Sequence, residues 1–259
     1  MSDNSDYTVL FARIADAVKM AQRKNAPAFV GFLSEPEAAN VRQYLISQDF
    51  IMNFGKGVKY CFFGGYENAE RLIFASLPDW AESADDIDFP ILILKLGHNP
   101  VYSLSHRDYL GAIMSLGIER DRVGDIVVSS DGAVIMLHSS IANHVKSQLE
   151  KIGRVGITSE FIDEFTDETS AKFMLIRSTV ASNRLDCIVA ALSHTSREKA
   201  VDMITAKLCF VNGIECDNTS KRISNGDVIT IRKKGKFMID SVEDKTKKNR
   251  TVLVARQKI

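Results

Sequence analysis

Apolar positions near the start of the chain recur with the period of an α-helix. One face would comprise Leu10, Ile14, Ala17, Val18 and Ala21. Because residues three, four and seven positions apart share a helix side, this pattern predicts a helix that buries that side. A second helix is predicted after Ser34, which can form a capping box with Glu37. The aromatic run 50–63, which glycines interrupt, predicts strands joined by tight turns.

The middle of the chain alternates apolar runs with helical segments. Strands are predicted at 91–94, 125–128, 133–137 and 155–158, and helices at 106–116 and 140–152, the latter with Gly153 as its C-cap. The order strand–helix–strand–strand–helix–strand is that of a split β-α-β unit, the ferredoxin-like arrangement found in RRM domains. The acidic stretch 82–88 before it is interpreted as a linker. Acidic residues recur over 159–170, followed by a predicted strand at 171–179.

The last third of the chain combines two short helices with a small sheet. Helices are predicted over 184–192 and after a capping box at 195–198. The Asn212-Gly213 pair predicts a type I′ hairpin, because both central residues of that turn need positive φ. Strands follow at 228–232 and 237–239. The predicted fold class is therefore α+β, with a small N-terminal domain at 1–80, an RRM-like domain at 81–170 and a third domain at 182–259.

Charge is distributed unevenly, although the formal net charge is zero. Residues 182–259 contain 16 Lys and Arg against 9 Asp and Glu, a balance of +7. Residues 81–181 contain 9 against 15, a balance of −6. A basic domain attached to an acidic body indicates phosphate binding by the basic part, with the body left out of contact.

Composition limits the compartment and the chemistry. An apolar content of 45% and a charged content of 25% are typical of a soluble globular protein. The polar, acidic start is unlike a signal peptide, and no apolar run could span a bilayer, so we expect a cytoplasmic protein with no membrane partner. The cysteines, Cys61, Cys187, Cys209 and Cys216, are too scattered for a zinc site or a disulfide framework. We expect reduced thiols, three of them in the core, and no metal or other cofactor.

Four landmarks in the basic part occur in a characteristic order and spacing. They are Ser182-Asn183-Arg184-Leu185-Asp186, Thr195-Ser196-Arg197-Glu198, Val211-Asn212-Gly213 and Gly226-Asp227-Val228-Ile229. This pattern resembles the S4 RNA-binding domain over residues 182 to about 240. The resemblance implies binding of structured RNA through the paired helices. The chain departs from that family at Lys207, where a glycine is common, and we expect this to alter the turn before the hairpin while adding a cation.

The cations of the predicted helices are placed at helix starts. Arg184 precedes the first helix, and Arg197 and Lys199 lie in the first turn of the second. Cations there oppose the helix macrodipole, so they do not serve helix stability, and the free amides can accept a phosphate. The candidate RNA-binding residues of this domain are Arg184, Ser196, Arg197, Lys199, Lys207, Arg232, Lys233, Lys234 and Lys236. For any single lysine, a solvated surface is an equally good explanation.

Upstream motifs extend the resemblance over nearly the whole chain. Gly64-Gly65-Tyr66, Ala69-Glu70-Arg71, 106–112 and 116–126 resemble the YlmH group of bacterial S4 proteins. That resemblance implies a non-enzymatic protein that binds rRNA and tRNA on the large ribosomal subunit. It further implies a role in rescuing stalled subunits that carry peptidyl-tRNA, within ribosome-associated quality control. RNA binding is also ascribed to the middle domain of that group, and no DNA partner is expected.

The middle domain offers fewer candidates of its own. Arg107, Arg120 and Arg122 flank one predicted helix and could form a basic edge, although surface charge pairs explain them equally well. Arg120 is assigned to such a pair, and Arg107 and Arg122 stay candidate RNA contacts. The predicted strands 91–96 and 133–137 are aliphatic and lack the aromatic pair that stacks bases in RRM domains, so base stacking is not expected.

An RNA-modifying enzyme with an S4 targeting domain is the alternative hypothesis. Arg184-Leu185-Asp186 superficially matches the catalytic motif of pseudouridine synthases, but Cys187-Ile188-Val189 does not continue it. The glycines at 55 and 57 lack the third glycine of a nucleotide-binding loop, and the histidines show no metal-ligand or triad grouping. A deep polar pocket with paired acid and base groups in the first two domains would favour the enzyme.

Overall fold

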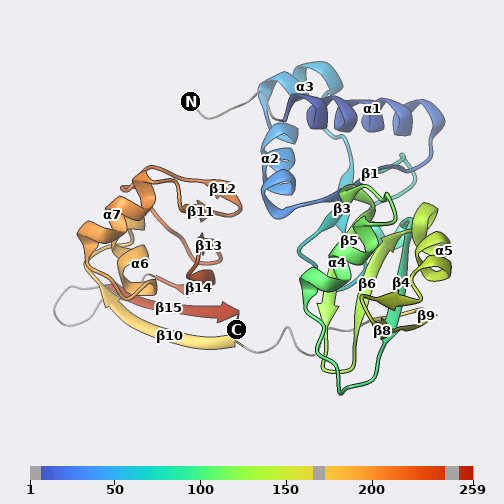
Figure 1. Cartoon of the computed structure of the whole chain (residues 1–259). Helices are drawn as coiled ribbons and strands as arrows, with labels where there is room; N and C mark the ends of the chain where they lie inside the picture. Colours follow the sequence, from blue (N-terminus) through green and yellow to red (C-terminus); the bar gives the residue numbers. More distant parts are fainter. Residues whose placement is uncertain (1–6, 166–172, 243–250, 259) are drawn as a thin grey trace. The chain divides into compact units, whose positions relative to one another are not determined.

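The computed structural model of the chain describes residues 7–165, 173–242 and 251–258, in two compact units, Met1–Asp167 and Glu168–Ile259 (Figure 1). The first unit holds the first two predicted domains, and the boundary between those two stays a prediction. The second unit holds the basic domain. Both units mix helices with antiparallel sheets, so the class is α and β mixed, as predicted.

The N-terminal part of the first unit is a small sheet with helices. Its elements are α1 (Thr8–Lys24), β1 (Ala28–Leu33), α2 (Glu35–Leu45), α3 (Gln48–Phe54), β2 (Tyr60–Phe63) and β3 (Leu72–Ser76). The strands pair in the antiparallel order β1-β3-β2. The predicted inner face of α1 is buried at all five positions, and the capping box of Ser34 and Glu37 is present.

One prediction in this part was wrong. Residues 50–54, the start of the run 50–63 expected to form strands and turns, belong to the helix α3. Ser47 caps it by accepting a hydrogen bond from the amide of Phe50 at 3.2 Å. Phe50 and Phe54 are four residues apart, and their rings stack at 4.7 Å on one helix face. The aromatic residues therefore follow a helical period before the chain enters β2.

The middle part of the first unit is a four-stranded sheet with two helices. Its elements are β4 (Ile91–Gly97), α4 (His106–Met114), β5 (Val123–Val128), β6 (Gly132–His138), α5 (Ser139–Gln148), β7 (Lys151–Ile152), β8 (Val155–Gly156) and β9 (Thr158–Ile162). The sheet order is β5-β6-β4-β9, with antiparallel neighbours. The predicted order of strands and helices is present, but the last strand of the sheet is β9, whereas the strand expected at 155–158 falls mainly on the small β7–β8 hairpin.

Two local expectations in the middle part need correction. The helix α5 ends at Gln148, four residues before the predicted end, and Gly153 does not cap it. Gly153 instead has a φ of 59° in the turn between β7 and β8. The acidic stretch expected to be a linker contains a 3-10 helix, η1 (Ala84–Asp86), and its Ile87 is buried in a cluster with Leu77 and Ala81.

The two faces of this sheet have different coverings. On one face Leu94 and Leu96 pack with Tyr109 and Ile113 of α4. On the other face Met136 packs with Phe32 of the N-terminal part. A Cβ on Gly124 would lie 2.6 Å from the Phe32 ring, so only glycine permits this close approach. The N-terminal part therefore covers the sheet face that the helices leave open.

Polar groups also hold the two parts of the first unit together. The guanidinium of Arg71 donates to the carbonyls of Phe32 at 2.7 Å and Val123 at 3.0 Å. The carboxylate of Asp125 accepts from the Tyr66 hydroxyl at 2.9 Å and from the amides of Glu70 and Arg71 at 2.6 and 3.0 Å. Burial lowers the pKa of Arg71. Arg71 and Asp125, both within the family-like motifs, thus have structural roles.

The second unit places two helices on a six-stranded sheet (Figure 1). Its elements are β10 (Phe173–Val180), α6 (Leu185–Leu192), α7 (Arg197–Thr205), β11 (Cys209–Val211), β12 (Ile214–Glu215), β13 (Val228–Ile231), β14 (Gly235–Ser241) and β15 (Thr251–Lys258). The sheet order is β10-β15-β14-β13-β11-β12. The first residues of the strand predicted at 171–179 lie outside the described residues, and β15 was not predicted.

Helix ends and turns in this unit follow their sequence signals closely. Ser196 caps α7 one residue later than the expected capping box began, and its hydroxyl accepts from the amide of Lys199. Asn212 and Gly213 have φ of 53° and 79°, as a type I′ hairpin requires. The predicted apolar side of α6 is buried at every position, in a core that includes Cys187, Cys209 and Cys216.

Candidate RNA-binding surface

The two arginines predicted at the helix starts meet at one carboxylate. Arg184 is the N-cap residue of α6 and Arg197 is the first residue of α7. Asp186 accepts from Arg184 Nε at 3.2 Å and Nη2 at 3.0 Å, and from Arg197 Nε at 3.0 Å and Nη2 at 2.7 Å. The positions of the two guanidiniums are therefore fixed relative to each other.

Asp186 is the buried centre of this arrangement, with 2% of its surface exposed. Its carboxylate also accepts from the backbone amide of Cys187 at 2.9 Å. Burial alone would raise the pKa of Asp186, but the hydrogen bonds from Arg184, Arg197 and Cys187 outweigh it and lower the pKa to about 2. The carboxylate is thus ionised at neutral pH. It holds two cations that would otherwise repel one another.

The guanidiniums themselves stay accessible. The side chains of Arg184 and Arg197 are 39% and 56% exposed. Hydrogen bonds with Asp186 raise the pKa of both, so both remain charged. A guanidinium has five N–H donors, and a carboxylate uses only some of them, so the outward donors can bind the oxygens of a phosphate. Preorganisation of this kind reduces the entropy lost on binding.

A loop that the sequence-based prediction missed lies beside the first turn of α6. The amide of Leu185 donates to the carbonyl of Lys221 at 2.8 Å, and that of Asp186 donates to Thr219 at 3.1 Å. Arg184 and Arg222 form an isolated antiparallel bridge. We define the helix-start cluster as Arg184, Arg197, Lys199, Lys221 and Arg222. The basic pair at 221–222 was the only available signal in the sequence, and nothing local linked it to the helices.

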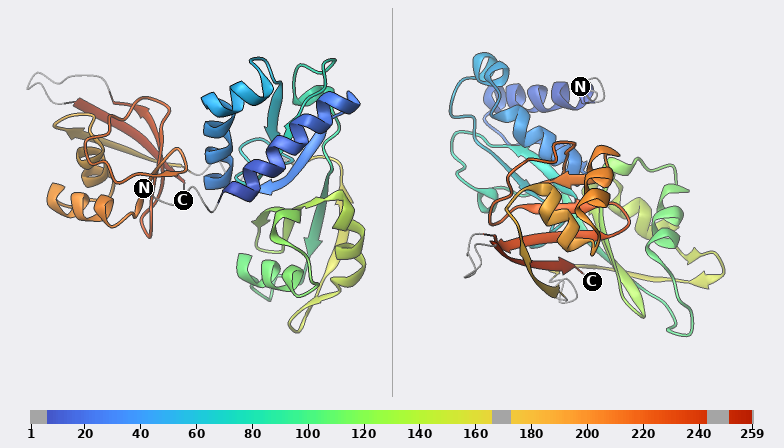
Figure 2. Two further views of the ribbon diagram at one scale, coloured as in Figure 1. Left: turned by 90° about the horizontal axis from the view of Figure 1, so that it is seen from above. Right: turned by 90° about the vertical axis from the view of Figure 1, so that its left-hand side faces the viewer.

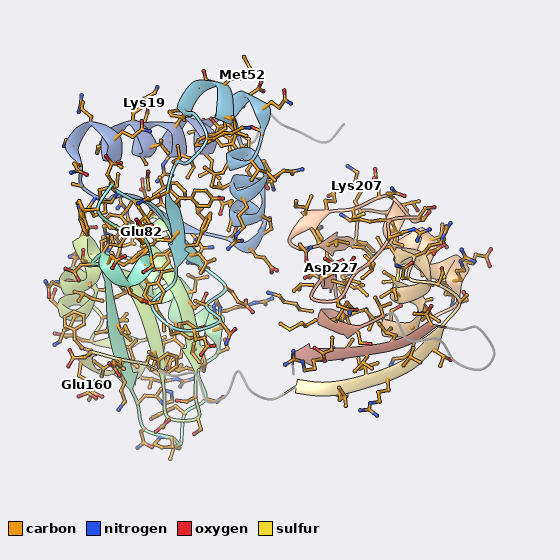
Figure 3. The ribbon with its side chains drawn as sticks, turned by 180° about the vertical axis from the view of Figure 1, so that it is seen from behind. Lys19, Met52, Glu82, Glu160, Lys207 and Asp227 are labelled. Carbon is orange, nitrogen blue, oxygen red and sulfur yellow. The ribbon has the colours of Figure 1, made fainter. Side chains whose placement is uncertain are left out.

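The remaining candidates of this domain group around β11 and β13. Lys207, marked in Figure 3, lies 3.0 Å from Glu215, and the guanidinium of Arg232 lies over the Phe210 ring at 5.2 Å. Lys233 and Lys234 form the turn between β13 and β14, and Lys236 is a half-buried residue of β14. The nine residues of α7 separate Arg197 from Lys207 by roughly 13 Å along the axis. The structure thus places the candidates at two ends of this helix.

Lys207 lies in the turn that ends α7. Its φ is 59°, in the left-handed region. The amide of Lys207 donates to Ile204 and that of Leu208 donates to Met203, at 3.0 and 3.1 Å. These two bonds make a Schellman motif, which closes a helix at a left-handed residue. The lysine is therefore accommodated in a left-handed conformation at some strain.

The candidates in the first unit differ in their surroundings. The guanidinium of Arg120 donates to the carbonyl of Val123, and burial lowers its pKa to about 10, so Arg120 is structural. Arg122 lies 3.8 Å from Asp121 and beside the ring of His138. Arg107 is exposed in the first turn of α4. Base stacking on the β4–β6 face is blocked, because the N-terminal part covers it.

The first unit also contains a pocket of about 540 Å³. Its ionisable groups are all carboxylates, Asp85, Asp88, Asp163 and Glu164, with no histidine, lysine or cysteine among the lining residues. Its lining therefore offers no histidine, lysine or cysteine as a base or nucleophile. Within the described residues, no group of three His, Cys, Asp or Glu side chains could hold a metal ion, and no helix has the length and apolar character to cross a membrane.

Comparison with known proteins is consistent across sequence and fold. A family model described as "Putative RNA-binding domain in YlmH" matches residues 85–166. The ribosome-associated protein quality control protein P2 of Bacillus subtilis (strain 168) is 32% identical over 204 residues, covering 78% of this chain and 79% of that protein. A solved structure, the cell division protein ylmH from Streptococcus pneumoniae, has a similar fold, with a TM-score of 0.50 at 21% identity over 63% of this chain and 94% of that chain. The chain thus belongs to the YlmH family, together with the quality control protein P2.

Proposed function

We propose that the chain is a non-catalytic RNA-binding protein that binds rRNA and tRNA on the large ribosomal subunit. Its role is to recognise stalled subunits that still carry peptidyl-tRNA, in ribosome-associated quality control. It acts in the cytoplasm without a cofactor. Support comes from the relative's name as a ribosome-associated quality control protein and from the family model for an RNA-binding domain.

Residues 182–259 form an S4 domain in this proposal, and the middle domain has the RRM-like, ferredoxin-like topology. The S4 assignment is supported by the paired helices α6 and α7 on a sheet, and by the Asn212-Gly213 hairpin after them. The strand order β5-β6-β4-β9, antiparallel throughout, supports the ferredoxin-like assignment. Because the usual RRM face is covered, RNA contacts of the middle domain use its loops and helix ends, where Arg107 and Arg122 lie.

The observation that carries the proposal is the arginine pair on Asp186. Two exposed guanidiniums are held by one buried carboxylate, and the loop with Lys221 and Arg222 runs beside them. Fixed cations of this kind can contact backbone phosphates of folded RNA without identifying bases. We therefore expect the helix-start cluster to recognise RNA shape and phosphate positions rather than sequence.

Binding to purified large subunits tests the proposal. The wild-type chain should bind subunits that carry peptidyl-tRNA more tightly than vacant subunits, because both RNAs contribute phosphates. Arg197→Ala should weaken binding about tenfold and reduce the log–log salt slope by about 0.9. The affinity of Arg197→Lys should lie between those of wild type and Arg197→Ala, because lysine keeps the charge but loses the bidentate geometry of the guanidinium.

Arg177→Ala is the matched control. Arg177 is an exposed residue of β10 in the same unit, and its loss changes the net charge equally. It should change the affinity less than about threefold, because it lies outside the cluster. Equal affinity of wild type and Arg197→Ala, with equal salt slopes, would show that the cluster does not contact RNA. Equal binding to vacant and loaded subunits would contradict the role in stalled complexes.

A further inference from the structure

The pocket of the first unit is a groove with an aromatic floor. Phe63 of β2 and Phe89 pack edge to face at 5.2 Å, and Phe165 packs on Tyr66 at 5.3 Å. Phe63 and Leu92 are both 36% exposed, although each is large and apolar. At about 540 Å³, the groove has the size of sites that enclose side chains or small ligands.

Carboxylates surround this floor. Asp85 and Asp88 precede β4 in the chain, and Asp163 and Glu164 follow β9. All four side chains are exposed. The fourteen lining residues include no Lys or Arg. Within the described part of the chain, none of these four side chains has a salt bridge to a cation, whereas the nearby Lys59 pairs with Glu82. The groove therefore combines apolar surface with four uncompensated negative charges.

This combination selects the chemistry of an occupant. RNA is disfavoured, because its phosphates would meet four carboxylates. An acidic or neutral apolar ligand would leave the charges unmatched. A basic peptide satisfies both features, since an apolar side chain can enter among the rings while neighbouring cations pair with the carboxylates. Guanidinium groups gain further from the aromatic faces.

We propose that this acidic aromatic groove binds a Lys/Arg-rich segment of a protein partner, with one large apolar side chain of the segment inserted among Phe63, Phe89 and Phe165. The first unit would then hold a protein partner while the second holds RNA. Opposite charges on the two units allow one chain to contact both components of a ribonucleoprotein. This inference does not depend on the RNA-binding proposal, because the groove belongs to the first unit alone.

Fluorescence anisotropy with the full chain and short labelled peptides tests the groove. The probe is the pentapeptide Arg-Lys-Phe-Arg-Lys, and the comparison peptide carries serine in place of phenylalanine. The phenylalanine peptide should bind at least fivefold more tightly at low salt. The double variant Asp88→Lys/Asp163→Lys should weaken its binding about tenfold, because two attractions become repulsions. Both residues are exposed, so the fold should be retained.

A matched double variant separates local contact from net charge. Asp16→Lys/Glu150→Lys makes the same charge change at exposed positions outside the groove, and it should weaken binding less than threefold. Equal loss in both double variants, or equal binding of the two peptides, would overturn the proposal.

A photo-crosslinking residue in place of Leu92 supplies an independent test on large subunits. An adduct that maps to a basic protein segment supports the proposal. An adduct to RNA overturns it.

Discussion

Replacing Asp186 by asparagine should destabilise the second unit strongly, because Asp186 is the buried charge under two arginines. The pKa of this carboxyl is about 2 in the folded chain, against an ordinary value of 3.8. One pKa unit corresponds to about 1.36 kcal/mol, so the network contributes roughly 2–3 kcal/mol at neutral pH. Asparagine removes the charge and leaves Arg184 and Arg197 close together. The exposure of both arginines lets them move toward water, which keeps the cost below that of a fully buried broken pair.

Urea unfolding followed by circular dichroism between pH 7 and pH 2 measures this cost. The folded pKa of Asp186 is lower than its unfolded pKa, so its contribution is fully present above about pH 4. The contribution is lost as the pH falls through about 2, below which the carboxyl is protonated in both states. The difference between wild type and Asp186→Asn should therefore be largest at pH 7 and shrink steadily below pH 4.

Asp202→Asn provides the control for this experiment. Asp202 is an exposed residue of α7, so its change should cost less than about 0.5 kcal/mol at every pH. If Asp186→Asn were as stable as Asp202→Asn at pH 7, the carboxylate would not organise the arginines. A large difference that did not change with pH would show that packing, rather than charge, accounts for the effect.

Two further predictions concern backbone positions and are checked by thermal unfolding. Lys207→Gly should stabilise the second unit by up to about 1 kcal/mol, because glycine adopts the left-handed φ without strain, although the pair with Glu215 is lost; Lys207→Ala should instead be destabilising. Gly124→Ala should destabilise the first unit by about 1–3 kcal/mol, because its Cβ would press on the Phe32 ring. Gly111→Ala, in an exposed helix position with open space, should stabilise it by about 0.5–1 kcal/mol.

Elements with a strong local signal could be predicted from the sequence. The period of α1, the capping box at Ser34 and the Asn212-Gly213 turn each involve interactions within a few residues. The interactions that form these elements all lie within a short stretch of sequence. The predictions for them were therefore confirmed. The aromatic run that became α3 lacked this advantage, because its glycines suggested turns while Phe50 and Phe54 had a helical spacing. Where local signals for helix and for turn are of similar strength, tertiary packing decides between the two structures. A short stretch of sequence does not contain that packing.

The end of α5 and the strand β15 show the same limit of local sequence patterns. Gly153 was expected to end α5, but the helix stops at Gln148 because residues 151–156 form a hairpin instead. The strand β15 has its partners in β10 and β14, and the pairing with β10 spans more than seventy residues of sequence. Such long-range pairing leaves little trace in a local pattern, so the six-stranded sheet could not be predicted in full.

The residues of the candidate site also fall into those that local sequence could predict and those that only the tertiary structure reveals. Arg184 and Arg197 were predicted because each stands at a helix start, where its charge has no stabilising purpose. Their shared partner Asp186 was interpreted only as a helix-start carboxylate, because Asp186 and Arg197 are eleven positions apart and no local pattern connects them. Lys221 and Arg222 were missed for the same reason. Propensity places a charge at the end of an element, and tertiary structure decides which other charges it meets.

In the RNA-binding surface that we propose, the burial of Asp186 explains why an acid can lie at the centre. The five cations of the helix-start cluster repel one another, and without a counter-charge they would tend to spread apart. A carboxylate that is 2% exposed attracts Arg184 and Arg197 from beneath while presenting almost no negative surface to RNA. Under this proposal the arginines have their relative positions fixed before RNA binds, and the buried acid adds little repulsion toward phosphate. A surface acid such as Asp202 could not have this effect, because solvent would screen its attraction and RNA would meet its charge.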